Sequence, residues 1–260
     1  MDDNNNLKKR ICLTDEIRGF AVLMMVLYHC YFVMGDFFGI EAGARLYDFF
    51  APAEPFFAGL FIIICGMSCT LSRSNLKRGL KALAAALAFT LVTAVILPRF
   101  GVDGAQVWFG ILHFLACSIL FYALAGKVLD RIPPRAGLII CAVLFIFFRN
   151  IEKGMLGFFG PLSFSLPEKL YTVRFLVPFG IYPADYYAAD SFPLLPFIFV
   201  FLAGVCLGRF FKEQGYPEWA YKKRVPFLDF IGTHAFIIYL LHIPVTALLI
   251  YGIMSLIKLF

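Results

Sequence analysis

The sequence predicts an all-α, polytopic transmembrane helix bundle of about seven spans with its N-terminus in the cytoplasm. Three observations support this fold class. Of the 260 residues, 61% are hydrophobic, 15% are charged and thirty-two are phenylalanine, whereas soluble domains carry about 25% charged residues. The mean hydropathy is +0.83. Long apolar runs also recur at about the 20 residues that a membrane helix needs. We therefore expect one integral membrane domain over residues 1–260, with 1–17 as a cytoplasmic N-terminal segment.

The predicted spans follow one another with short polar connections. The apolar runs lie near residues 19–38, 55–72, 79–98, 106–127, 136–149, 193–211 and 229–255. The fifth run is short for a membrane span. The stretch 155–184 is also apolar, but four prolines interrupt it. It is predicted to be a re-entrant or interfacial segment, or alternatively to hide a further span, so that the total is seven, or else eight or nine.

The basic residues predict the orientation of these spans. The segments before the first span and after the second, fourth and sixth hold 16 of the 23 lysines and arginines. Because basic loops stay in the cytoplasm, we expect a multi-pass protein of the plasma membrane with a cytoplasmic N-terminus. The net charge of +6 sits in short clusters between apolar runs, which argues against nucleic acid as a partner.

The seven cysteines do not predict a metal site. Most lie inside apolar runs, and Cys65 and Cys69, four residues apart, have no further cysteine or histidine ligands near them in the sequence. Buried cysteines usually behave as small hydrophobic residues. No metal is therefore expected.

Three histidines are predicted to share one depth in the membrane. His29 follows Arg18 by eleven residues, which in an α-helix is about 16 Å along the axis and nearly the same face. His113 and His242 fall at a similar depth in their own helices. Ionisable side chains inside membrane helices usually face the bundle interior and mark functional sites. The alternative is that each histidine only forms a hydrogen bond between helices.

These residue types suit acyl transfer. Histidine titrates near neutral pH and can accept the proton of an amine or hydroxyl that attacks a thioester. The planar guanidinium of Arg18 suits the phosphates of an acyl carrier such as coenzyme A. The cluster "RSNLKRGLK" adds Arg73 and Arg78 as candidate donor-binding residues, although positive-inside topology alone explains most of that cluster.

Two acidic residues near the non-cytoplasmic ends of spans are candidate acceptor-binding residues. Glu54 precedes the second span and Asp190 precedes the sixth, and either carboxylate would attract a cationic amino sugar. The alternatives are structural: Asp190 as an N-cap and Glu54 as an acid favoured by the helix dipole. Asp15 is predicted to pair with Arg18 on the helix surface.

Several segments resemble a known family when they are taken in order. They include "TDEIRGFAVLMMVLYH", "VWFGILHFLACSIL", "DSFPLLPFIFVFLAGVCLGRF" and "IGTHAFIIYLLHIPV". Over about residues 14–250 the chain resembles the heparan-α-glucosaminide N-acetyltransferase catalytic-domain family, in its small bacterial branch. The resemblance implies a membrane enzyme that passes acetyl from cytosolic acetyl-CoA to a sugar amine across the membrane. By motif match it assigns site roles to Arg18, His29, His113, Asp190 and His242.

One departure from the family bears on the mechanism. In the lysosomal branch the favoured catalytic histidine lies in the first non-cytosolic loop, but residues 36–54 of this chain contain no histidine. His29 or His113 would then take the role of base.

The predicted function is that of an N- or O-acyltransferase with acetyl-CoA as donor. A sugar or glycan is the expected acceptor, and the enzyme is expected to lie in the lipid bilayer. Transfer is expected to be direct, within a ternary complex of enzyme, donor and acceptor. The sequence leaves the choice between a monomer and a homo-oligomer open. Two alternatives come from other classes: a proton-linked transporter that uses the same histidines as a relay, and a non-catalytic membrane subunit.

Overall fold

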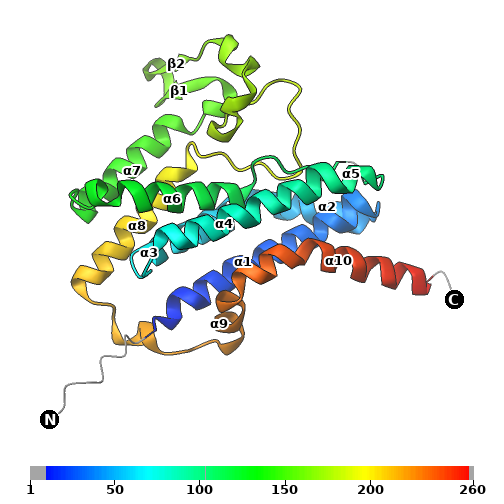
Figure 1. Ribbon diagram of the computed structural model, residues 1–260, viewed down its shortest axis with the longest axis horizontal. Coiled ribbons are helices and arrows are strands. Elements are labelled where there is room, and N and C mark those ends of the chain that lie inside the picture. The colour runs from blue at the N-terminus through cyan, green and yellow to red at the C-terminus, as the bar shows by residue number, and fades with distance from the viewer. Residues whose placement is uncertain (1–9, 103, 258–260) are drawn as a thin grey trace. The chain divides into compact units, whose positions relative to one another are not determined.

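The structure is a computed structural model that describes residues 10–102 and 104–257 (Figure 1). Its α-helices are α1 (Cys12–Phe32), α2 (Glu41–Phe50), α3 (Glu54–Cys69), α4 (Asn75–Thr90), α5 (Leu97–Arg99), α6 (Ile111–Leu129), α7 (Pro134–Phe148), α8 (Phe197–Gln214), α9 (Pro226–Thr233) and α10 (Ala235–Ile257). Two short strands, β1 (Met155–Gly157) and β2 (Ser163–Ser165), pair antiparallel. Residues 1–9 of the predicted N-terminal segment 1–17 lie outside the described residues. From Cys12 onward this segment belongs to α1.

The helices confirm the predicted fold class. Six helical stretches are long and apolar enough to cross a membrane: Cys12–Phe37, Glu41–Cys69, Asn75–Arg99, Ile111–Leu129, Pro134–Lys153 and Ala235–Leu256. The protein is thus an all-α, multi-pass membrane protein. Helix α8 forms at the predicted sixth span but is not one of these six stretches. Its last six residues include the charged residues Arg209, Lys212 and Glu213. The total of seven spans and the cytoplasmic N-terminus stay predictions.

Three parts of the chain differ from the expected helix pattern. Residues 41–50, expected as a loop, form α2, with an exposed ion pair between Arg45 and Glu41 at 2.5 Å. The predicted run 229–255 is broken between α9 and α10 at His234, whose Nδ1 lies 2.9 Å from the Phe230 carbonyl oxygen. The first helix begins at Cys12 and not at residue 19, because Thr14, Asp15 and Glu16 before the apolar run are buried where α1 packs against α9.

The apolar stretch 155–184 contains no further span. It forms the β1–β2 hairpin followed by short 3₁₀ turns, and no α-helix lies between α7 and α8, a part of the chain that is described throughout. Proline has no backbone N–H, so inside an α-helix it removes a hydrogen bond and kinks or breaks the helix. Pro161, Pro167 and Pro178 each fall at or inside one of these turns, which explains why this apolar sequence does not become a membrane helix.

The described chain divides into two compact units. The first unit comprises residues up to Ile64 together with those from Gly215 onward, and the second unit comprises Cys65–Gln214. The division falls inside α3.

In the first unit, α1 and α9 approach closely through two glycines. A Cβ atom on Gly19 would overlap the carbonyl oxygen of Leu228, and one on Gly232 would overlap the carbonyl oxygen of Asp15. Small residues at such crossings let membrane helices pack backbone to backbone. Beside this crossing lies the apolar core of the unit, formed by Val22, Ile231 and Ala235.

The close approach of α1 and α9 predicts that alanine substitutions at two glycines affect stability differently. Gly19→Ala should lower the free energy of unfolding by about 1–3 kcal/mol, because the added methyl group meets a backbone carbonyl that cannot rotate away. Gly59→Ala is the control, since a Cβ at Gly59 meets no atom within 4 Å, and it should be neutral or stabilising by up to about 1 kcal/mol. Thermal unfolding in detergent measures both. Equal melting temperatures of the two variants would contradict the crossing.

In the second unit, α4 lies beside α6 and α7 beside α8 (Figure 1). Two loop segments also pair in parallel: Phe109 bridges to Ser191, and the Phe192 N–H donates to the Phe109 carbonyl oxygen at 2.9 Å. This pairing holds Asp190 beside the first turn of α6.

Candidate active site

In the first unit, α1 and α10 bring two of the predicted histidines into contact. The ring centroids of His29 and His242 lie 4.9 Å apart, with the ring planes inclined by 57°. The sequence placed both residues at one depth, and the structure shows that they also face each other. His113 belongs to the second unit, so its place in a common layer stays a prediction.

Hydrogen bonds fix how protons are distributed in the neutral rings. The Nδ1 atom of His29 lies 3.0 Å from the Met25 carbonyl oxygen, and that of His242 lies 2.6 Å from the Tyr239 carbonyl oxygen. A carbonyl oxygen only accepts, so each Nδ1 carries the hydrogen and each Nε2 carries the lone pair. The Nε2 atom of His242 is buried without a hydrogen-bond partner among the described residues. The pair therefore presents two proton acceptors inside apolar helices.

A second contact also holds α1 against α10 next to the histidine pair. Cys30 Sγ, next in sequence to His29, lies 3.3 Å from Thr246 Oγ1, one turn after His242. Rigid placement matters because a base works only within hydrogen-bonding reach of the proton that it accepts.

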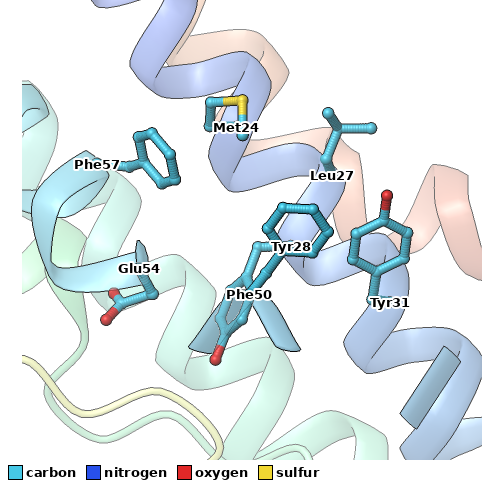
Figure 2. A pocket seen from close by; sticks show the side chains of 7 residues that line it. All are labelled: Met24, Leu27, Tyr28, Tyr31, Phe50, Glu54 and Phe57. Atoms are coloured by element: carbon cyan, nitrogen blue, oxygen red, sulfur yellow. The ribbon is translucent and has the colours of Figure 1, made fainter. Parts of the chain in front are cut away.

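A small pocket of the first unit contains the predicted residue Glu54. Its volume is about 30 Å³, room for a group of the size of one or two water molecules. Glu54, the first residue of α3, shares the pocket with the rings of Tyr28, Tyr31, Phe50 and Phe57 (Figure 2). A carboxylate among aromatic faces favours a bound cation.

The pocket and the histidine pair are neighbours through Tyr28. The ring centroid of Tyr28 lies 5.9 Å from that of His29. On another side, Tyr28 stacks on Tyr47 of α2 with the centroids 4.5 Å apart. Helix α2, which the sequence analysis missed, thus helps to position a wall of the pocket.

Arg18 lies in a network of ion pairs at the start of α1. Its Nη1 donates to Asp15 Oδ1 at 2.5 Å and lies 3.4 Å from the Gly232 carbonyl oxygen, which confirms the predicted Asp15–Arg18 pair. Arg10 bridges Asp15 and the buried Asp229, with nitrogen–oxygen distances of 2.6 and 3.0 Å. The network orients the Arg18 guanidinium and ties α1 to α9.

In the second unit, His113 and Asp190 both lie at the N-terminal turn of α6. Asp190 Oδ2 accepts the Ile111 N–H at 3.3 Å. Asp190 was expected as a possible cap of the sixth span, but α8 begins at Phe197, so that capping role is wrong. His113 Nε2 lies 3.1 Å from Thr90 Oγ1. The parallel loop pairing, which helix periodicity does not reveal, places Asp190 beside this turn.

The two predicted donor-binding arginines of the second unit differ in their surroundings. Arg73 is exposed in the loop between α3 and α4. Arg78 points into the helices, with its Nη2 atom 3.2 Å from Cys65 Sγ and its Nη1 atom 3.7 Å from Cys69 Sγ. The two cysteines are thus hydrogen-bond acceptors for a guanidinium as well as buried apolar groups.

One family model matches the chain. It is described as heparan-alpha-glucosaminide N-acetyltransferase, catalytic, and it covers residues 10–244. The chain belongs to this family. No curated protein and no solved structure matches it.

As a member of the heparan-alpha-glucosaminide N-acetyltransferase family, the chain is a membrane acetyltransferase in its general class. The matched range includes parts of both units and every predicted site residue from Arg18 to His242. Within residues 10–102 and 104–257, no group of three or more histidine, cysteine, aspartate or glutamate side chains is placed to hold a metal ion.

Sequence reasoning missed several residues around these sites. The aromatic walls beside Glu54 had a usable signal, because Tyr28 and Tyr31 are three residues apart and share a face of α1. Thr90 had none, since its contact with His113 joins residues 23 positions apart on two helices.

Proposed function

We propose that this acetyltransferase takes the acetyl group of acetyl-CoA on the cytoplasmic side of the plasma membrane and transfers it to an amine of a sugar acceptor on the opposite side. The observation that supports this most is the His29–His242 pair. It brings two imidazole rings, each with a proton-accepting Nε2, into contact inside apolar helices. If each histidine served only to form a hydrogen bond between helices, no proton-accepting nitrogen would need to stay without a partner.

The proposed reaction is direct transfer with His29 as general base. The acceptor nitrogen attacks the carbonyl carbon of the thioester while His29 Nε2 takes a proton from that nitrogen. A C–N bond forms, the C–S bond breaks, and coenzyme A leaves as a thiolate that recovers the proton. The products are an amide and free coenzyme A. General base catalysis of this kind contributes about 10²–10⁴-fold to a rate.

His242 is proposed to share the proton with His29. Two imidazolium ions in contact would repel each other, so the pair accepts one proton much more readily than two. The two rings then act as one base, with the carbonyl oxygens of Met25 and Tyr239 holding them in the required orientation.

The Glu54 pocket is proposed to bind the acceptor as an ammonium ion, which releases one proton to water before its neutral nitrogen attacks. A protonated amine gains from the Glu54 carboxylate and from the faces of Tyr28 and Phe57, and the Tyr28 ring lies next to the base. This supports an amine over a hydroxyl as the attacking group. In the second unit, His113 stays the predicted alternative base and Asp190 a predicted acceptor-binding residue.

Arg18 of the first unit is proposed to bind the phosphates of the donor. Arg18 lies eleven residues before His29 on α1, about 16 Å along the axis, and Asp15 holds its guanidinium in place. Arg73 and Arg78 of the second unit stay predicted donor-binding residues. This arrangement requires the N-terminus to be cytoplasmic.

Calorimetry with acetyl-CoA tests the donor site. Arg18→Ala should weaken binding about 10–100-fold, because a hydrogen bond to a charged group contributes about 1.5–3 kcal/mol. His29→Ala should bind as the unchanged protein does. Arg45→Ala is the control, since Arg45 also pairs with an acid one helical turn away, but on α2. Absence of binding to the folded, unchanged protein would overturn the proposed function.

A further inference from the structure

The second unit has a larger pocket that the proposed reaction does not use. It has a volume of about 580 Å³ and lies in the loops between helices, within the range of about 300–1,000 Å³ usual for small-molecule sites. Six of its lining residues carry aromatic or polar groups: Gln106, Trp108, Arg174, Asp185, Tyr186 and Tyr187.

Hydrogen bonds between two loops hold the walls of this pocket in place. The Ala189 N–H donates to the Gln106 carbonyl oxygen at 2.8 Å, and the Tyr187 hydroxyl donates to the Gly104 carbonyl oxygen at 3.1 Å. These bonds join the loop before α6 to the loop before α8. A site held in this way loses little freedom when a ligand binds.

Aromatic faces are open on the pocket wall. Trp108 is 50% exposed and Tyr187 is 61% exposed. The Tyr186 ring is held in place because it stacks on the Tyr182 ring, with centroids 5.0 Å apart and planes inclined by 5°. Flat, rigid rings of this kind offer apolar contact to the face of a ligand at a low cost in conformational entropy.

A charged pair supplies the polar groups. Arg174 Nη2 lies 2.5 Å from Asp185 Oδ2, and both side chains are largely exposed. An exposed ion pair adds little to stability, so its groups can exchange partners at little cost. A carboxylate beside a guanidinium presents charged acceptors and donors side by side, which suits neighbouring hydroxyl groups.

We infer that this pocket, which lies within the second unit, binds a pyranose ring of the glycan class proposed as acceptor. A pyranose combines an apolar face, which suits Trp108 and Tyr187, with neighbouring hydroxyl groups on its rim, which suit Arg174 and Asp185. The inference rests on the proposed function for the identity of the acceptor as a sugar. Aromatic residues also mark membrane interfaces, but a concave wall with an ion pair and the Gln106 amide suits a hydroxylated ligand better than lipid.

Tryptophan fluorescence tests binding without any donor. The chain has two tryptophans, so Trp219→Phe leaves Trp108 as the only reporter. A tetramer of β-1,4-linked glucosamine should change the Trp108 emission in a saturable way, and Asp185→Asn should weaken that binding about tenfold. A Trp108 emission that brominated lipid quenches and that the tetramer leaves unchanged would overturn the inference.

Kinetics separate this inference from the proposed function. Trp108→Ala should raise KM for the glucosamine tetramer about tenfold, with kcat for single glucosamine unchanged, and Trp219→Ala is the control. Normal transfer with the same KM for the tetramer in all variants would overturn the sugar-ring site while the proposed function stands. Saturable binding of the tetramer without acetyl transfer by the unchanged protein would overturn the proposed function and leave the site in place.

Discussion

His29→Ala is expected to lower the rate of acetyl transfer by about 10²–10⁴-fold. The substitution removes the Nε2 lone pair of the proposed base, while Arg18, the residue proposed to bind the donor phosphates, is unchanged. KM for acetyl-CoA should therefore stay within about twofold, so that the loss falls on kcat. Initial rates with radiolabelled acetyl-CoA and glucosamine as acceptor measure both quantities.

His234→Ala is the matched control for this prediction. His234 also has its Nδ1 atom near a backbone carbonyl oxygen, that of Phe230 at 2.9 Å, but it lies at the junction of α9 and α10. It should keep nearly full activity. An equal loss in both variants, or a lower melting temperature of His29→Ala, would assign the effect to folding and contradict the role of base.

A double substitution tests whether the two rings act as one base. If His29 and His242 share the proton, either single alanine variant should lose most of the activity. The double variant should then lose little more, since residues that act as a unit are not additive. Independent effects that multiply would contradict the shared role.

The sequence predicted the depth of His29 and His242 but not their contact. Depth follows from counting residues along a helix of known rise. The direction in which a side chain points across the bundle depends on helix packing, and α1 packs against α10 at His29 but against α9 at Gly19. A glycine in an apolar run does not reveal which helix it will meet.

Asp190 shows the same limit for loops. Its position before Pro193 is typical of a helix start, and local reasoning therefore assigned it to the following helix. The parallel pairing of Phe109 with Ser191 instead places it at the N-terminus of α6, whose Ile111 N–H it accepts. Helix α2 was missed for a related reason, because its ten residues are too few and too polar to stand out as a span.

Glu54→Gln is expected to raise KM for an amino sugar by about 10–100-fold. The amide keeps the shape of the side chain but removes the charge that holds a protonated amine, and such charged contacts are worth about 1.5–3 kcal/mol. The rings of Tyr28 and Phe57 remain, so binding should weaken and not vanish (Figure 2). Initial rates over a range of glucosamine concentrations measure the change.

Asp48→Asn is the matched control, because Asp48 is an exposed acid six residues earlier that does not line the pocket. It removes the same charge from the same region, so a general electrostatic effect would appear in both variants. The prediction for Glu54 also depends on the chemistry of the acceptor. If the attacking group were a hydroxyl, no positive charge would enter the pocket, and Glu54→Gln would leave KM within about twofold. A large effect of Glu54→Gln beside a small effect of Asp48→Asn would therefore support both the pocket and N-acetylation.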